Sequence, residues 1–517
     1  MITRIRILGA ALMVLYLALF VQLNRVQLFG AERLQDHAEN TRGLIREFGQ
    51  QRGDILTADD VVIARSAPHS DDIDYRREYP EGDLYAHVVG YQSLNVAATG
   101  LERAFNDELA GTTVEQQFRS LTDLFSDRDT TADLVLTIRD DVQRVARDAL
   151  GDRNGSVVAL DPRTGAVIAM WSYPSFDPNP VASPDGVVAN AAYDSLLAAP
   201  GDPLLAKAFR EIYFPGSTFK IVTGSAGVTS GLVGPADPVF PSTDAYEPIP
   251  AGEPIGNFGG STCGGDLMEV LRVSCNTAFA EMGAEWVGPG LMIDVAESFG
   301  FNSTPPFDVP GVAESRFPTA YGSRLADVGF YRGTGDEEND EVELPNGSVN
   351  VYEDTARLAQ ASIGQNDVAA TPLQMALVAA AIANDGLIMA PHVVAELRGA
   401  EGQVYETTEP AEWRRAIDTH VADVMRSAML NVAANGTARN MAVPGLEVGG
   451  KTGTAQLGTE VPSSHAWIVG FAGRPGGEVE LAVAVIVEAQ EGADEQTGGR
   501  VAAPIAKRIL EAALLGF

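Results

Sequence analysis

The 517-residue sequence predicts a mixed α/β (α+β) protein with one membrane-spanning helix at its N-terminus. Two observations predict the sheet. Strand-like apolar runs lie at both ends of the segment 151–517, and several helical patterns lie between them. This order favours one mainly antiparallel sheet that is assembled from both ends of the segment and flanked by helices. A hydrophobic content of 45% indicates a folded chain with a substantial core, and the length indicates more than one domain.

The first 28 residues predict the topology. Arg4 and Arg6 precede an apolar run from Ile7 to Leu23, and no small-residue cleavage site follows it. This favours an uncleaved signal-anchor over a cleaved signal peptide. Arginines on the N-terminal side hold a short tail, residues 1–6, in the cytoplasm. We therefore expect a transmembrane signal-anchor at residues 7–28 of a single-pass cell-membrane protein, with everything after it outside the cytoplasm.

Residues 29–150 are expected to form a separate small mixed module. They begin with polar, arginine-rich sequence, continue through short strand-like pieces, and end in a helical pattern from Ile138 to Leu150 that Gly151 caps. They contain no constellation of nucleophile, base or metal ligands, so a spacer or docking platform is the better interpretation. The net charge of −34 would repel nucleic acid, and no nucleic-acid partner is expected.

The elements of the second domain, residues 151–517, follow from local patterns. Ser156–Trp171 is two apolar runs around a Pro/Gly turn, which predicts a hairpin. Thr371-Pro372 is a good helix start, and that helix is expected to end near Gly386. Three more strands are predicted near the C-terminus, followed by an amphipathic helix: Glu447–Gln456, His465–Gly473, Glu478–Glu488 and Val501–Leu515.

Lysine is rare in this chain. Only four of the 36 lysine and arginine residues are lysines, at positions 207, 220, 451 and 507. Arginine cannot release its proton inside a protein, whereas a desolvated lysine amine can. Lys220 follows Ser217 by three residues, after Pro215-Gly216, and residues at this spacing share a helical face. A serine in the first helical turn with a buried lysine beside it is typical of an activated nucleophile and its base, although a serine cap with a surface lysine fits the same pattern.

Two further short motifs accompany this pair. Lys451-Thr452-Gly453-Thr454 follows two glycines inside a strand pattern, where an exposed edge could pair with an extended peptide while the lysine and the threonines meet its terminal carboxylate. Ser274-Cys275-Asn276 joins two helical pieces, and this position distinguishes it from the two other Ser-x-Asn triplets of the chain. Each motif alone also fits an ordinary turn.

The only cysteines are Cys263 and Cys275. An oxidising compartment permits a disulfide between them, and two buried free thiols are equally compatible with the sequence.

Ser-x-x-Lys, a Ser-x-Asn triplet and Lys-Thr-Gly, in this order, form the known signature of penicillin-binding proteins and class A β-lactamases. The chain as a whole resembles class B penicillin-binding proteins, most closely the actinobacterial penicillin-binding protein A type. Four segments beyond the motifs carry the resemblance: "RGDILTADDVVIARS" (52–66), "ATGLERAFNDELAG" (98–111), "GSVVALDPRTGAVIAMWSYPSFDPN" (155–179) and "ATPLQMALVAAAIANDG" (370–386). One departure is Asn366-Asp367 after Gln365, where many relatives have a second glycine.

The resemblance implies a D,D-transpeptidase that cross-links peptidoglycan stem peptides and needs no metal or cofactor. Ser217 would attack the D-alanyl-D-alanine carbonyl and Lys220 would take its proton. Ser274 and Asn276 would relay protons and position the substrate amide, and Lys451 would supply positive charge. Thr452 and Thr454, with Gly453 between them, would hold the substrate carboxylate. The N–H groups of Ser217 and Thr454 would form the oxyanion hole. β-Lactams would block the serine.

The resemblance also implies partners. Residues 29–150 resemble the family's non-catalytic pedestal, or dimerisation-like domain, and are too few for the glycosyltransferase of related enzymes. A membrane glycan polymerase and divisome or elongasome proteins are therefore expected to supply the lipid-linked nascent glycan. Two alternatives remain. One is a D,D-carboxypeptidase or β-lactamase-like hydrolase, although Ser427 stands where class A lactamases have a glutamate before Leu430-Asn431. The other is a catalytically silent scaffold, which would have little reason to keep two of four lysines in the motifs.

Overall fold

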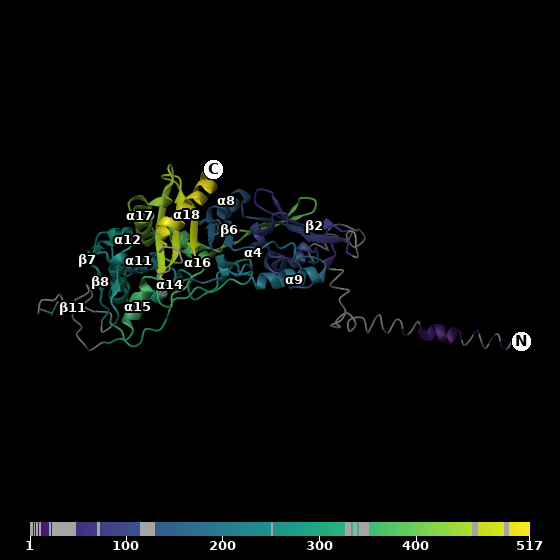
Figure 1. Ribbon diagram of the computed structural model, residues 1–517, viewed down its shortest axis with the longest axis horizontal. Coiled ribbons are helices and arrows are strands. Elements are labelled where there is room, and N and C mark those ends of the chain that lie inside the picture. Colours follow the sequence, from purple (N-terminus) through teal and green to yellow (C-terminus); the bar gives the residue numbers. More distant parts are fainter. Residues whose placement is uncertain are drawn as a thin grey trace.

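The computed structural model describes residues 48–69, 73–113, 130–249, 252–325, 351–456, 464–490 and 496–516, with short pieces between residues 4 and 22 and at 332–333 and 339–340. The signal-anchor expected at residues 7–28 therefore lies largely outside the described residues. Within the described part of the chain, no helix combines the length and the apolar character needed to cross a bilayer. Two large sheets follow one another along the long axis of the molecule (Figure 1), and the described residues also form four two-stranded sheets.

The larger domain is built on a five-stranded sheet of order β17-β18-β19-β5-β6, in which every neighbouring pair is antiparallel. Its strands are β5 (Gly155–Leu160), β6 (Val167–Tyr173), β17 (Glu447–Gln456), β18 (Ser464–Gly473) and β19 (Val479–Val487). The predicted hairpin and the three predicted C-terminal strands are confirmed, and so is the sheet assembled from both ends of the segment. All of β5 is buried, which explains why that strand is continuously apolar and shows no alternation.

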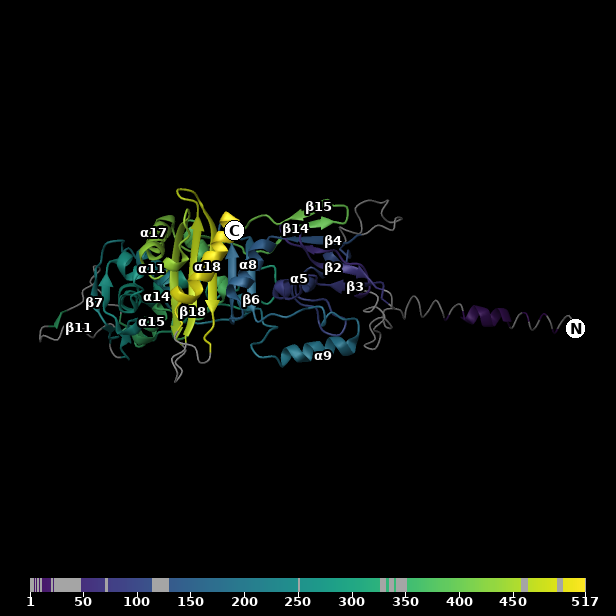
Figure 2. The ribbon, with the colours of Figure 1, turned by 45° about the horizontal axis from the view of Figure 1, so that its top comes forward.

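Helices cover both faces of this sheet. The C-terminal helix α18 (Gly498–Leu515) packs on β18 and β19 beside α8 (Asp140–Leu150) (Figure 2). Helix α16 (Pro372–Ala383) packs on β5, β18 and β19. The predicted start of α16 is confirmed, because the Thr371 hydroxyl accepts the N–H of Gln374 at 3.0 Å and Pro372 occupies the first helical position. Every residue of α16 is buried, so this helix is apolar on all sides.

A mainly helical layer lies beyond the free edge of β17. Its helices are α11 (Lys220–Thr229), α12 (Leu267–Arg272), α13 (Asn276–Glu281), α14 (Gly288–Ser298), α15 (Thr355–Ser362) and α17 (Thr419–Asn435). Short strand pairs accompany them: β7 (Phe240–Thr243) with β10 (Cys263–Gly265), β8 (Ala245–Tyr246) with β9 (Ile255–Gly256), and β13 (Leu387–Met389) with β16 (Glu412–Arg415). Helix α17 contacts β17 and also packs on α11 and α12, which places this layer against the sheet edge. The short helix α10 (Lys207–Arg210) packs instead on β5, β6 and α16.

The N-terminal sheet has six strands in the order β15-β14-β4-β1-β2-β3. Its strands are β1 (Ile55–Leu56), β2 (Val62–Pro68), β3 (Tyr75–Glu78), β4 (Ala132–Leu136), β14 (Val394–Gly399) and β15 (Val404–Thr407). The accompanying helices are α4 (Ala86–Val89), α5 (Gly100–Ala104), α6 (Asn106–Leu109) and α9 (Gly186–Leu197). Strand β1 is parallel to β4, and the remaining pairs are antiparallel.

The boundary expected at residue 150 does not divide the two sheets cleanly. Strands β14 and β15 come from the C-terminal half of the chain and complete the N-terminal sheet, because β14 pairs with β4. Helix α8, placed before the boundary by its sequence, packs instead on β5, β6 and α18. The two parts therefore exchange one hairpin and one helix.

A buried carboxylate links two of the segments on which the family resemblance rests. Glu102 is fully buried, and its two oxygens lie 3.1 Å from Arg52 Nη2 and 2.5 Å from Arg77 Nε. Burial alone would raise the pKa of Glu102, but the charges of Arg77 and Arg52 outweigh burial and lower that pKa. The "RG" segment near residue 52 and the "GLE" segment near residue 100 thus meet at one ion-pair cluster.

Candidate active site

The turn that carries Ser217 is fixed by its backbone. Gly216 has φ +52°, in the left-handed region, and its N–H donates to Gly364 O at 2.9 Å. Trp467 Nε1 donates to Phe214 O at 3.1 Å, so β18 holds the residues just before the turn. Residues Gly216–Phe219 form a 3₁₀ turn that leads directly into α11. Ser217 is half-buried in this turn.

Lys220 begins α11, three residues after Ser217. Side chains at this spacing eclipse in a 3₁₀ turn, which puts Ser217 and Lys220 on one side, as the sequence predicts. Lys220 is fully buried, and its Nζ donates to Ser274 O (2.8 Å), Ser274 Oγ (3.4 Å) and Asn276 Oδ1 (2.6 Å). Among the described contacts, Lys220 Nζ therefore bonds to the Ser-x-Asn triplet and not to Ser217. Burial, with a smaller effect of the Lys451 charge, holds the pKa of Lys220 well below its usual value.

The Ser274-Cys275-Asn276 triplet forms the connection between α12 and α13, and the side chain of Asn257 holds it in place. Ser274 has φ +63°, which is uncommon for a residue other than glycine. The side-chain oxygen of Asn257 accepts the N–H groups of Asn276 (2.8 Å) and Thr277 (3.1 Å) and so holds the start of α13. Sequence reasoning did not find Asn257, because it lies far from every motif and no local pattern marks it.

Strand β17 carries the third motif to the same place. Lys451 is fully buried, and its Nζ donates to Ser274 Oγ and to Thr452 O, both at 2.8 Å. Burial lowers the pKa of Lys451 to about 7. A Cβ at Gly453 would lie 2.8 Å from Pro215 O, so only glycine allows β17 to approach the Ser217 turn this closely.

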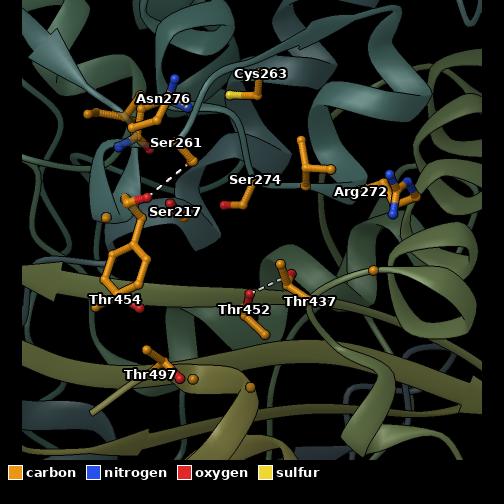
Figure 3. A pocket seen from close by; sticks show the side chains of 18 of the residues that line it. Ser217, Ser261, Cys263, Arg272, Ser274, Asn276, Thr437, Thr452, Thr454 and Thr497 are labelled. Carbon is orange, nitrogen blue, oxygen red and sulfur yellow. Dashed lines mark hydrogen bonds between the residues drawn. The ribbon is translucent and has the colours of Figure 1, made fainter. Parts of the chain in front are cut away.

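These motifs surround one cavity of about 840 Å³ (Figure 3). Ser217, Ser274, Asn276, Thr452 and Thr454 line it, while Lys220 and Lys451 lie buried behind them. All of the sequence-predicted site residues are therefore brought together. A residue that sequence reasoning missed is Thr437, whose hydroxyl accepts the hydroxyl of Thr452 at 2.7 Å.

Cys263 and Cys275 form a disulfide in this structure. The sequence left a disulfide and two free thiols equally open. Cys275 is buried between Ser274 and Asn276, and Cys263, in β10, lines the cavity. The bond therefore ties the Ser-x-Asn tip to the neighbouring strand pair.

Asn366, the first residue of the departure at Asn366-Asp367, lines the cavity. Asn366 has φ +59°. Asparagine tolerates this left-handed conformation better than most residues, so it can occupy a position where the family resemblance leads us to expect glycine.

The arrangement is suited to acyl transfer. It combines a hydroxyl in a tight turn, two buried amines of lowered pKa that share one serine hydroxyl, and a strand edge that can receive an extended peptide.

Comparison with known proteins agrees with this chemistry. Residues 155–511 match the family described as "Penicillin binding protein transpeptidase domain", and residues 52–135 match "Penicillin binding protein A dimerisation domain". The chain is 37% identical over 528 residues to "Peptidoglycan D,D-transpeptidase PbpA" of Mycolicibacterium smegmatis, with 99% of each chain covered. The protein of the same name from Mycobacterium tuberculosis is 35% identical over 533 residues, again with 99% of each covered.

Solved structures of penicillin-binding proteins also resemble this chain. Penicillin-binding protein A from M. tuberculosis, as a ceftriaxone acyl-enzyme complex, superimposes with a TM-score of 0.78 at 33% identity, covering 90% of this chain and 99% of that one. Its penicillin G acyl-enzyme complex gives a TM-score of 0.76 at 34% identity, covering 90% and 100%.

Proposed function

Because the chain belongs to the penicillin-binding protein family and is a peptidoglycan D,D-transpeptidase, we propose that Ser217 is the nucleophile that carries the donor stem peptide as an acyl-enzyme. The enzyme acts in cell-wall synthesis and binds β-lactams. The observation that carries the proposal is the hydroxyl of Ser274, which two buried lysines share at the wall of the cavity that Ser217 lines.

In the first half-reaction, Ser217 Oγ attacks the carbonyl carbon of the penultimate D-alanine, and its proton passes to the neutral Lys220 amine. The N–H groups of Ser217 and Thr454 stabilise the oxyanion that forms. The tetrahedral intermediate then breaks its C–N bond and expels D-alanine. The leaving amine takes a proton from the Ser274 hydroxyl, which Lys220 reprotonates. Both amines lie within hydrogen-bonding distance of Ser274 Oγ, Lys220 Nζ at 3.4 Å and Lys451 Nζ at 2.8 Å, which supports this relay.

In the second half-reaction, an amine of a neighbouring stem peptide attacks the ester carbonyl of the acyl-enzyme. The same relay now removes the proton of that amine, and Ser217 leaves with a proton. Asn276 positions the substrate amide and the ammonium of Lys451 supplies positive charge in both half-reactions. Thr452 and Thr454 hold the terminal carboxylate of the donor only in the first, because that carboxylate leaves with D-alanine. The exposed edge of β17 is suited to main-chain pairing with the donor peptide.

We further propose that residues 7–28 anchor the enzyme in the cell membrane, with its catalytic domain outside the cytoplasm and residues 29–150 acting as a pedestal. A membrane glycan polymerase, working with division or elongation proteins, would supply the lipid-linked nascent glycan. The apolar run behind Arg4 and Arg6 supports the anchor. We expect the full-length protein in the membrane fraction of the cell and the variant that lacks residues 1–28 outside it, and a truncated variant that stays in the membrane fraction would contradict the anchor.

The roles in the site can be tested with a fluorescent penicillin, followed by mass mapping of the modified peptide. We expect the label on the peptide that contains Ser217 and its loss in Ser217→Ala. Ser261→Ala is the matched control, because this serine also lines the cavity but bonds to Phe258 O. A label on another side chain, or reversible binding only, contradicts the proposal.

The two alternative functions, a hydrolase and a catalytically silent scaffold, predict different results. Turnover of a chromogenic cephalosporin at several per second would indicate a hydrolase. Growth of cells that carry Ser217→Ala, under conditions where deletion of the whole gene is lethal, would indicate a scaffold.

A further inference from the structure

The charge of the cavity is opposite to that of the protein. The chain carries 70 acidic and 36 basic residues, yet the described residues that line the cavity include three arginines and neither aspartate nor glutamate. The arginines are Arg272, Arg439 and Arg500. A cavity that excludes carboxylates from its described wall in so acidic a protein is suited to an anionic ligand.

Two of these arginines are available to a ligand. Arg272 is engaged, since its guanidinium lies 2.6 Å from Glu269 Oε1 and donates to Asn435 O at 3.0 Å. Arg439 and Arg500 are exposed, and neither forms an ion pair with any other residue that the structure describes. Many other arginines of the described chain pair with a carboxylate, as Arg163 and Arg474 do even at the surface.

Both arginines belong to segments that meet at Thr452. Arg439 lies two residues after Thr437, whose hydroxyl bonds to that of Thr452. Arg500 lies in the first turn of α18, next to Gly499, where a Cβ would lie 2.6 Å from Thr437 O and 3.7 Å from Thr452 Cγ2. Asn440 Nδ2 donates to Gly499 O at 2.7 Å and fastens the two segments together. The start of the 18-residue helix α18 adds a partial positive charge to the same place.

We propose that Arg439 and Arg500 form an anion-binding subsite beside Thr452 that binds the terminal carboxylate of the donor peptide and the corresponding carboxylate of a β-lactam. The inference rests on the proposed function and adds two residues outside the three motifs. An arginine guanidinium remains charged and presents a planar fork that matches a carboxylate. The buried ammonium of Lys451 alone is a weaker anchor, because it loses its proton near neutral pH.

The test compares penicillin G with its neutral methyl ester. The second-order rate constant of acylation is measured for the wild type, for Arg439→Gln, for Arg500→Gln and for the double variant. We expect each arginine to contribute about tenfold for penicillin G, as for a charge-assisted hydrogen bond, and less than about twofold for the ester. The rate for penicillin G should also fall with ionic strength in the wild type and depend less on salt in the double variant.

Arg474→Gln is the matched control, because Arg474 is an exposed arginine in the turn between β18 and β19 and does not line the cavity. The double Arg→Lys variant should keep the salt dependence but recover only part of the rate. An equal loss for the acid and the ester, or no loss for either, overturns the subsite while leaving the acyl-enzyme at Ser217 intact. Absence of acylation in the wild type would instead overturn the proposed function.

Discussion

Lys220 and Lys451 converge on one hydroxyl, because Ser274 Oγ lies 3.4 Å from the Nζ of Lys220 and 2.8 Å from that of Lys451. Both amines are buried, and desolvation destabilises the charged form of each amine. The charge of Lys451 further lowers the pKa of Lys220, so Lys220 loses its proton before Lys451 does. A neutral base and a charged neighbour can therefore coexist around Ser274.

This order of deprotonation predicts a bell-shaped pH dependence of acylation by penicillin G. The rate should rise as Lys220 becomes neutral and fall as Lys451 loses its proton, with the alkaline limb near pH 7. Stopped-flow measurement of the acylation rate constant between about pH 5 and pH 9 checks this. In Lys451→Arg the alkaline limb should disappear, since arginine stays protonated. An unchanged alkaline limb in that variant would assign it to another group.

The disulfide should matter for both stability and rate. Cys263 and Cys275 enclose a short loop, and replacing both by serine should lower the free energy of unfolding by about 3 kcal/mol. Acylation should slow as well, because Cys275 lies between Ser274 and Asn276. Urea unfolding and labelling with fluorescent penicillin measure the two effects. Reduction of the wild type should reproduce both, and a reduced enzyme with wild-type rate and stability would contradict a role for the bond.

Lys207 is a buried lysine that the chemistry does not use. Its Nζ lies 2.6 Å from Glu488 Oε1, which also accepts the hydroxyl of Tyr213 at 2.8 Å. Tyr213 lies four residues before Ser217, and its backbone pairs with Ala370. Lys207→Met leaves the carboxylate without its cation, so we expect a loss of about 3 kcal/mol in the free energy of unfolding and slower acylation.

Lys507→Met provides the control for this change. Lys507 forms only a surface pair with Glu511 at 3.7 Å, and its removal should cost less than about 0.5 kcal/mol. Adding Glu488→Gln to Lys207→Met should recover part of the lost stability, because it removes the unpaired charge. No recovery in the double variant would show that packing, and not charge, determines the loss.

The buried cluster of the N-terminal sheet should affect stability without affecting the chemistry. Glu102→Gln leaves two buried guanidinium groups without a counter-charge, and we expect a loss of about 3 to 5 kcal/mol in the free energy of unfolding. Labelling of folded protein by fluorescent penicillin should keep its wild-type rate, since Glu102 does not line the active-site cavity. Glu78→Gln, which removes a carboxylate from a more exposed arginine pair, is the control. A slowed acylation in Glu102→Gln would instead reveal coupling between the two sheets.

Much of the fold could be read from local patterns. The hairpin of β5 and β6, the cap of α16 at Thr371 and the C-terminal strands appear where the sequence predicts them, because turn chemistry, capping and continuous apolar runs act between neighbours in the chain. The exchange of β14 and β15 into the N-terminal sheet was not predicted, since pairing between strands more than 250 residues apart leaves no local signal.

Patterns along the chain indicate which residues form the site. Rare lysines next to hydroxyl residues select Ser217, Lys220 and Lys451, and the place of the Ser-x-Asn triplet between two helical pieces selects Ser274 and Asn276. How these residues meet depends on the tertiary structure. It turned both lysines toward Ser274, placed Asn257 and Thr437 as supports, joined the cysteines and gathered Arg439 and Arg500 at the cavity wall. These contacts join segments far apart in sequence, and burial, which sets the pKa of each amine, exists only once the chain has folded around them.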